Sequence, residues 1–228
     1  RYPKAQSEEK QTTLNAKRVT ILTGHYGSGK TSIAVQYALR LREAGKKVSI
    51  CDLDIVNPYF RSTDHRAELE AAGVCLVTSQ FAGSNLDIPA LPKELYAAIA
   101  YKSGYAVLDV GGDDRGAVAL GRYVPDIVDE DDYEMLFVAN FFRPLTKTAE
   151  DALQVLREVE AACGMRATAL VNNSNLGLET SAEDVLSTLE RMERFARLAE
   201  LPIAFTSVSN RLKEQLDHQL EHPFWMNF

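Results

Sequence analysis

The sequence lacks the features of several specialised protein classes. No apolar run reaches the roughly 18 residues that a membrane-spanning helix needs, and residues 1–17 are polar, mixed in charge and without a secretory signal pattern. Cysteine is scarce: the chain has only Cys51, Cys75 and Cys163, and no two of them form a C-x-x-C pair. This argues against a disulfide scaffold and fits reduced, buried thiols. We therefore expect a cytoplasmic protein with no stable membrane anchor.

Positive charge is also scarce. The 25 Lys and Arg residues are outnumbered by 32 Asp and Glu, which gives a net charge of −7, and no run of basic residues forms a patch. An acidic surface repels the phosphates of nucleic acids, so no nucleic-acid partner is expected. The four histidines show no metal-ligand spacing, so a zinc site has no support.

The pattern along the chain predicts one α/β domain. Short apolar runs, typical of strands buried on both faces, alternate with helical patterns, and this alternation favours parallel strands with crossover helices. We expect a single-domain, doubly wound, mostly parallel sheet of about seven strands with helices on both faces. Strands are predicted at 19–23, 48–52, 74–78, 105–110, 135–140, 167–172 and 203–206, and helices at 30–44, 63–72, 92–100, 146–162 and 182–200.

The remaining segments are assigned by composition. Residues 1–16 are expected to be a flexible N-terminal segment, 17–208 the folded domain, and 209–228 a C-terminal helix with an aromatic tail. The acidic stretch 125–134 is expected to be a solvated loop.

The strongest motif is a glycine-rich loop between the first strand and the first helix. Residues 24–31 read GHYGSGKT and fit the phosphate-loop pattern G-x-x-x-x-G-K-[ST] without a mismatch, whereas the spacing fails the dinucleotide pattern G-x-G-x-x-G. Glycines let backbone N–H groups turn toward a phosphate, Lys30 would reach the β- and γ-phosphates, and Thr31 would offer its hydroxyl to Mg²⁺. The residues expected to bind the nucleotide here are Gly24, Gly27, Ser28, Gly29, Lys30, Thr31 and Ser32.

Carboxylates at the ends of two predicted strands should face this loop. Asp109 ends an apolar run in the manner of a Walker B aspartate, which holds Mg²⁺ directly or through water. Asp52 and Asp54 share one face of an extended chain, so one could hold a metal-bound water while the other orients the attacking water. Gly112 could give its N–H to the γ-phosphate. For Asp52, Asp54 and Asp109, the alternative is a structural role as a helix-cap or turn aspartate.

The segments GHYGSGKT, DLDIVNPYFR, DVGGDD and VNNSNL together resemble the MinD/ParA/ArsA-type (CobQ/CobB/MinD/ParA) P-loop ATPases over about residues 18–208, and more narrowly an uncharacterised bacterial branch of that group. The resemblance implies ATP/ADP and Mg²⁺ as cofactors. It implies that Asp54 positions the hydrolytic water and helps to hold the metal, with Asp52 beside it. It also implies that Asp109 is the Walker B acid and that Asn172 contacts adenine, although a turn asparagine after a strand is the alternative.

The sequence departs from the family pattern at informative points. Members that form an ATP-sandwiched dimer carry a second lysine where this chain has His25, so a substitute charge could come from Arg61, Arg115 or Arg143. The iron–sulfur scaffold branch carries a C-x-x-C motif near its end, which is absent here, so that role is not expected. The guanine-specifying N-K-x-D motif is also absent, which favours ATP over GTP.

The C-terminal tail shows a helical stripe. Leu212, Leu216 and Leu220 repeat every four residues and are followed by aromatic residues. MinD proteins end in a membrane-binding amphipathic helix, but such helices have a basic polar face and this one is acidic. We therefore expect the tail to pack on the domain or on a dimer partner.

The resulting hypothesis is an ATP-binding P-loop protein with slow Mg²⁺-dependent ATPase activity, acting as a nucleotide switch that an unknown protein partner reads, with a homodimer possible. One alternative is an ATP-dependent transferase or ligase similar to dethiobiotin synthetase or an amidoligase, with residues 57–61 or 113–115 lining a pocket for a small-molecule acceptor. The other is a nucleotide sensor that does not hydrolyse its ligand.

Overall fold

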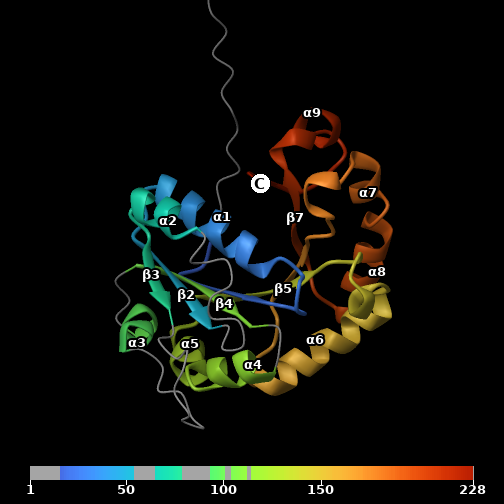
Figure 1. Ribbon diagram of the computed structural model, residues 1–228. Helices are drawn as coiled ribbons and strands as arrows, with labels where there is room; N and C mark the ends of the chain where they lie inside the picture. Colours follow the sequence, from blue (N-terminus) through green and yellow to red (C-terminus); the bar gives the residue numbers. More distant parts are fainter. Residues whose placement is uncertain (1–15, 54–64, 79–92, 101–103, 112–113, 228) are drawn as a thin grey trace, which may run out of the picture.

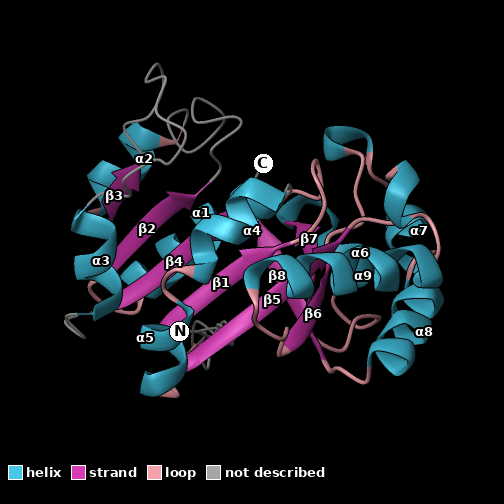
Figure 2. Ribbon diagram, turned by 90° about the horizontal axis from the view of Figure 1, so that it is seen from below, coloured by secondary structure: helices cyan, strands magenta, loops and turns pink. Residues whose placement is uncertain are grey.

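The computed structural model describes residues 16–53, 65–78, 93–100, 104–111 and 114–227 of the chain. Their strands form one parallel sheet in the order β3-β2-β4-β1-β5-β6-β7-β8 (Figures 1 and 2). The strands are β1 (Val19–Thr23), β2 (Val48–Leu53), β3 (Cys75–Thr78), β4 (Tyr105–Val110), β5 (Tyr133–Ala139), β6 (Ala169–Asn172), β7 (Ile203–Ser209) and β8 (Pro223–Met226). The helices are α1 (Lys30–Glu43), α2 (Arg66–Ala72), α3 (Lys93–Ala100), α4 (Asp114–Gly121), α5 (Val124–Glu130), α6 (Ala149–Cys163), α7 (Ala182–Leu186), α8 (Leu189–Ala199) and α9 (Lys213–Leu216).

The sheet has a hydrophobic core on each face, which confirms the predicted doubly wound α/β class. On β1, Leu22 packs toward α1, while its neighbour Ile21 packs into the opposite core beside α3, α4 and α5. Figure 1 shows α1 and α2 on one side of the sheet and α3, α4, α5 and α6 on the other. Burial of both faces explains why the central strands are mostly apolar and lack a regular alternation of apolar and polar residues.

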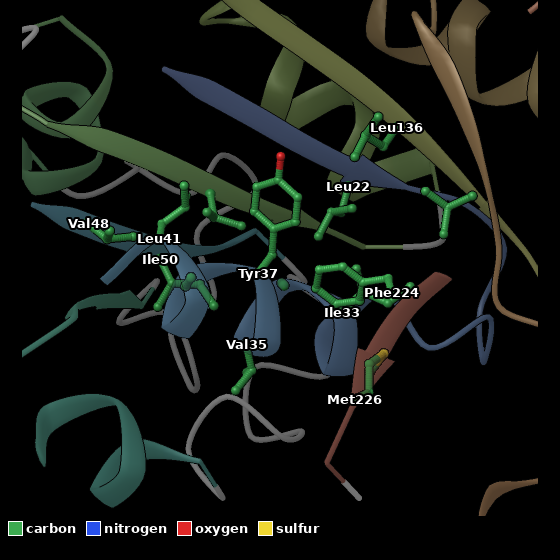
Figure 3. Packing of buried hydrophobic residues seen from close by; sticks show 14 of the residues in the cluster. Leu22, Ile33, Val35, Tyr37, Leu41, Val48, Ile50, Leu136, Phe224 and Met226 are labelled. Carbon is green, nitrogen blue, oxygen red and sulfur yellow. The ribbon is translucent and has the colours of Figure 1, made fainter. Parts of the chain in front are cut away.

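The helix α1 is the centre of one core. Its buried residues Ile33 and Tyr37 lie among strand residues such as Leu22 and Leu136 (Figure 3). Its buried face packs on β4, β2 and β1, and α1 begins directly after the glycine-rich loop. The loop is therefore held between two firmly anchored elements.

Strand order reverses at β1, because the chain places β4 and β2 on one side of it and β5 and β6 on the other. In open parallel sheets, ligands bind beyond the carboxyl ends of the strands at such a switch point. The end of β1, where the glycine-rich loop begins, therefore lies where this fold places a ligand.

The acidic stretch 125–134, expected to be a solvated loop, is instead helix α5 followed by the start of β5, and the expectation was wrong. Pro125 lies in the first turn of α5, where its missing N–H costs nothing, and Ile127 is buried beneath the helix. Ile127 thus anchors a short helix that also carries the acidic residues Asp126, Asp129 and Glu130. The helix predicted at 182–200 is also divided, into α7 and α8.

The C-terminal tail is part of the sheet. Asn210–Leu212 and α9 give one short helical stretch, and Leu212, Leu216 and Leu220 are buried against Val185 and Val208. The aromatic segment then pairs in parallel with β7 as β8, which adds a strand that the sequence pattern did not predict. None of the helices in the described ranges has the length and apolar character needed to cross a membrane.

Candidate nucleotide-binding site

The phosphate loop, residues 24–31, has the backbone shape that its glycines permit. Gly24, Gly27 and Gly29 have φ angles of 142°, 74° and 89°, which other residues rarely adopt. A Cβ atom on Gly24 would lie 2.4 Å from the carbonyl oxygen of Val138, and one on Gly29 would lie 2.1 Å from Nδ2 of Asn173. Glycine is therefore needed at these two positions, both for the backbone conformation and because other residues approach closely.

Lys30 turns its ammonium group back over this loop. Its Nζ donates hydrogen bonds of 3.0 Å to the carbonyl oxygens of Gly24 and His25, and the residue is buried. Among the side chains that the structure describes, two buried oxygens have no hydrogen-bond partner, Thr23 Oγ1 and Ser28 Oγ. Both lie in or directly before the phosphate loop, so a buried cation and hydroxyl groups without partners meet here, a combination that can bind an anion.

Thr31 and Asp109 meet beside the loop. The hydroxyl of Thr31 donates a hydrogen bond of 2.6 Å to Oδ2 of Asp109, whose residue is buried. Asp109 is paired in register with Asp52 on β2, which is also buried, so the two carboxylates enter the site from adjacent strands. A hydroxyl and a carboxylate in contact are hard oxygen donors, the kind that Mg²⁺ prefers.

The donor set fits a magnesium ion that is shared with a nucleotide. Within the described parts of the chain, no group of three or more His, Cys, Asp or Glu side chains could hold a metal ion alone. Mg²⁺ in nucleotide sites keeps water molecules and phosphate oxygens and takes one or two protein ligands, which matches Thr31 and Asp109. Ser32, the other predicted hydroxyl, is half-buried in the first turn of α1.

Several residues of the predicted site lie in parts of the chain that the structure does not describe. Asp54 and Gly112 lie outside the described residues, as do Arg61 and the predicted acceptor segment 57–61. For residues 113–115, only the backbone of the last two is described, at the start of α4.

Of the three arginines considered as a substitute charge, Arg143 lies against the phosphate loop. Its Nε donates a 3.0 Å hydrogen bond to the carbonyl oxygen of Gly27, and its side chain is exposed. A Cβ atom on Gly27 would lie 3.6 Å from the same nitrogen, so the guanidinium rests directly on the loop.

On the other side of β1, Asn172 is enclosed by its own loop. Its Nδ2 donates to Oγ1 of Thr188, and its Oδ1 accepts from both the backbone N and the hydroxyl of Ser174. The residue has no exposed surface. In this conformation the side chain organises the loop after β6 and does not face an open surface where adenine could lie.

The neighbouring Asn173, which the sequence reasoning did not select, contacts the phosphate loop. Its Nδ2 donates a hydrogen bond of 2.6 Å to the carbonyl oxygen of Ser28, across 145 positions of sequence. The only sequence signal was a second asparagine at the end of an apolar run, in VNNSNL.

No protein-family model matches the chain. The chain is similar to the cytosolic Fe-S cluster assembly factor cfd1 of Emericella nidulans, with 31% identity over 104 residues, which is 46% of this chain and 29% of the relative. It is also similar to the cytosolic Fe-S cluster assembly factor NUBP2 of Bos taurus, with 50% identity over 40 residues, 18% of this chain and 15% of the relative. The chain thus spans less than a third of the length of these curated relatives.

Solved structures with a similar fold include FtsY proteins of two bacteria. The signal recognition particle receptor FtsY of Elizabethkingia anophelis, in complex with GDP, superposes with a TM-score of 0.54 and 19% identity over 87% of this chain and 59% of that one. Cell division protein FtsY of Thermotoga maritima gives a TM-score of 0.53 and 16% identity over 83% and 61%. At these identities the likeness concerns the fold alone.

Proposed function

We propose that this chain, which has the P-loop NTPase fold and is related in sequence to MinD/ParA-type P-loop ATPases, binds ATP with Mg²⁺ and hydrolyses it slowly as a nucleotide switch. The observation that carries the proposal is the contact between Thr31 and Asp109 beside a glycine loop that Lys30 caps. Membership of an uncharacterised bacterial branch stays a prediction from the motifs, and so does a cytoplasmic location.

Each residue has a role that follows from its chemistry. The backbone amides of the phosphate loop and the Lys30 ammonium would bind the β- and γ-phosphates. Thr31 and Asp109 would hold Mg²⁺, which when bound neutralises charge on the transferring phosphoryl group. Asp54, helped by Asp52, would orient the attacking water and support the metal, and the N–H of Gly112 would meet the γ-phosphate.

The position of the acidic residues sets the direction of the nucleotide. Asp52 and Asp109 lie on β2 and β4, on one side of β1, so the terminal phosphate and metal belong on that side. The base would then lie over the loops that follow β5 and β6. We propose that Asn172 shapes the loop facing the base, and that it contacts adenine only if bound nucleotide opens that loop. The absence of N-K-x-D in the sequence supports ATP over GTP.

The proposed partners are a protein that reads the nucleotide state and a second copy of this chain. The curated relatives are described as iron–sulfur cluster assembly factors, yet this chain has no C-x-x-C motif, so we do not propose cluster scaffolding. We propose a protein partner that reads the nucleotide state, and a homodimer in which Arg143 in place of a loop lysine supplies positive charge near the phosphates. The relatives do not favour the transferase and sensor alternatives.

Calorimetry and phosphate release test the proposal. Wild-type protein is expected to bind ATP more tightly than GTP and to release phosphate slowly only with Mg²⁺. The variant Lys30→Ala should lose nucleotide binding, while Asp54→Ala should keep binding and lose turnover. Lys46→Ala is the matched control, because Lys46 is exposed and lies over Tyr105 at the start of β4, at the opposite end of that strand from Asp109. Tight ATP binding by Lys30→Ala would contradict the proposal.

A further inference from the structure

Asn173 joins the loop after β6 to the phosphate loop. It is buried, its backbone N–H donates to the carbonyl oxygen of Ala139 at the end of β5, and its side-chain Nδ2 donates to the carbonyl oxygen of Ser28 at 2.6 Å. The residue is thus fixed to the sheet by its backbone and to the phosphate loop by its side chain.

The orientation of the Asn173 amide is set by two further donors. Its Oδ1 accepts a hydrogen bond from the hydroxyl of Ser207 on β7 and one of 2.9 Å from Nδ2 of Asn175. If the amide were turned over, its NH₂ group would face the NH₂ group of Asn175, and its oxygen would face the carbonyl oxygen of Ser28. The surrounding hydrogen bonds therefore direct the Asn173 donor at the phosphate loop.

The anchored carbonyl belongs to the same peptide unit as the N–H of Gly29. In a planar trans peptide the C=O and N–H bonds point in opposite directions, and the described chain has no cis peptide bond. Holding the Ser28 oxygen toward Asn173 therefore directs the Gly29 N–H away from Asn173, to the opposite side of the peptide unit. Only glycine leaves room for this contact, because a Cβ atom on Gly29 would lie 2.1 Å from the Asn173 nitrogen.

We propose that Asn173 is a positioning residue for phosphate binding, which fixes the Ser28–Gly29 peptide so that its N–H faces the phosphate. The inference rests on the proposed nucleotide-binding function and adds a determinant from the loop after β6. Asn173 acts on the phosphate end of the ligand and does not read the base. Its removal should weaken every nucleoside triphosphate by the same factor, whatever the base.

The test compares ATP with inosine triphosphate, which has the same phosphates and a different purine edge. Asn173→Ala is expected to lower the affinity for both ligands about tenfold and to leave the ratio of the two affinities unchanged. A tenfold loss corresponds to one well-formed hydrogen bond of about 1.4 kcal/mol. Asn173→Asp should weaken both more strongly, because it places a carboxylate against the Ser28 carbonyl oxygen. Affinities are measured by calorimetry and unfolding free energies by urea titration.

Ser174→Ala is the matched control. Ser174 is buried in the same loop and bonds to Phe141 and Asn172, with no hydrogen bond to the phosphate loop. It should lower stability and leave affinity for both ligands at the wild-type value. If Asn173→Ala fails to fold, Ser207→Ala replaces it, since losing one support of the Asn173 amide should weaken both ligands by a smaller equal factor.

The outcomes separate the two proposals. If the wild-type protein binds neither nucleotide, the proposed function fails. If it binds ATP and the Asn173 and Ser207 variants bind as well as wild type, this inference fails and the function stands. Weakened ATP with unchanged inosine triphosphate would make Asn173 a base-reading residue and would also overturn the inference.

Discussion

Gly29 carries two constraints at once, a positive φ angle and close contact with Asn173. Gly29→Ala is expected to weaken ATP binding at least tenfold and to lower the free energy of unfolding by about 1–3 kcal/mol, because the new methyl group must displace the Asn173 amide as well as strain the backbone. Calorimetry and urea titration measure the two effects.

Gly45→Ala separates strain from contact. Gly45 has a similar φ of 76°, but no atom lies within 4 Å of the position of its Cβ. This variant should lose about 1 kcal/mol of stability and keep wild-type affinity for ATP. Equal affinities in the Gly29 and Gly45 variants would mean that the loop reforms around the methyl group.

Cys51 precedes Asp52 at the end of β2, and its reactivity reports whether that end of the strand is closed. The side chain is buried, and burial together with the nearby Cys75 and Asp52 raises the pKa of its thiol. A raised pKa leaves less thiolate at any given pH, so iodoacetamide at pH 8 should modify the exposed Cys75 and spare Cys51. Mass spectrometry of the folded protein checks this, with urea-unfolded protein as the control in which all three cysteines react. Equal labelling of Cys51 and Cys75 in folded protein would show that β2 opens near Asp52.

The sequence could predict site residues whose chemistry is local and could not predict those that act through distant contacts. Lys30 and Thr31 stand in a motif, and Asp109 ends an apolar run, so each can be found within a short window, and the structure brings these residues together. Arg143 and Asn173 reach the phosphate loop from the segments that follow β5 and β6. The sequence offered Arg143 only as one of three candidate charges and marked Asn173 only as a second asparagine after an apolar run, because their partners are more than 100 positions away.

At the scale of single elements, β8 could not be predicted from the sequence pattern. The leucines before it repeat every four residues, and this period correctly indicates a buried helical face. The four residues of β8 are too short for a period to be read, and they become a strand because β7 offers an open edge. The side chains of Phe224 and Met226 then pack in the core that contains α1. Similarly, α5 was missed because only its packing on Arg18 and the sheet distinguishes it from a solvated acidic loop.

Phe224 ties this edge strand to the helix that follows the phosphate loop. It is buried, its ring stacks on Phe205 at 4.7 Å between centroids, and the Arg40 guanidinium lies 3.9 Å from its centroid. Phe224→Ala should lower the free energy of unfolding by about 3–5 kcal/mol, the usual cost of removing a core phenylalanine. Urea titration measures the loss.

Trp225→Ala is the comparison for Phe224, since Trp225 is only half-buried on the same strand and should cost less. A Phe224 variant as stable as wild type would show that the tail is detached. A tail held in the sheet should also leave the intact protein unbound in flotation with anionic liposomes.

At the scale of the whole molecule, the fold class could be predicted and the strand order could not. Alternating strands and helices imply a parallel sheet whatever the order. Which strands are neighbours depends on pairing across long stretches of sequence, such as β1 with β4 and β5. This pairing matters for function, because it places Asp109 next to the phosphate loop while β2 brings Asp52 beside it.

Binding energy from such a site should appear as stability of the entire domain. A ligand that binds only the folded state adds about 2.7 kcal/mol at 100 times its Kd, which for a chain of this length raises Tm by roughly 5–10 °C. We expect ATP with Mg²⁺ to give such a shift and ATP with EDTA a smaller one. In Asp109→Asn the amide oxygen can still accept the Thr31 hydroxyl, so the fold should persist, but the carboxylate charge that holds the ion is lost. The difference between the Mg²⁺ and EDTA shifts should therefore vanish in Asp109→Asn and remain in the exposed control Asp129→Asn. If the difference between the Mg²⁺ and EDTA shifts is as large in Asp109→Asn as in the wild type, Asp109 does not hold the metal ion, and the proposed metal site is wrong.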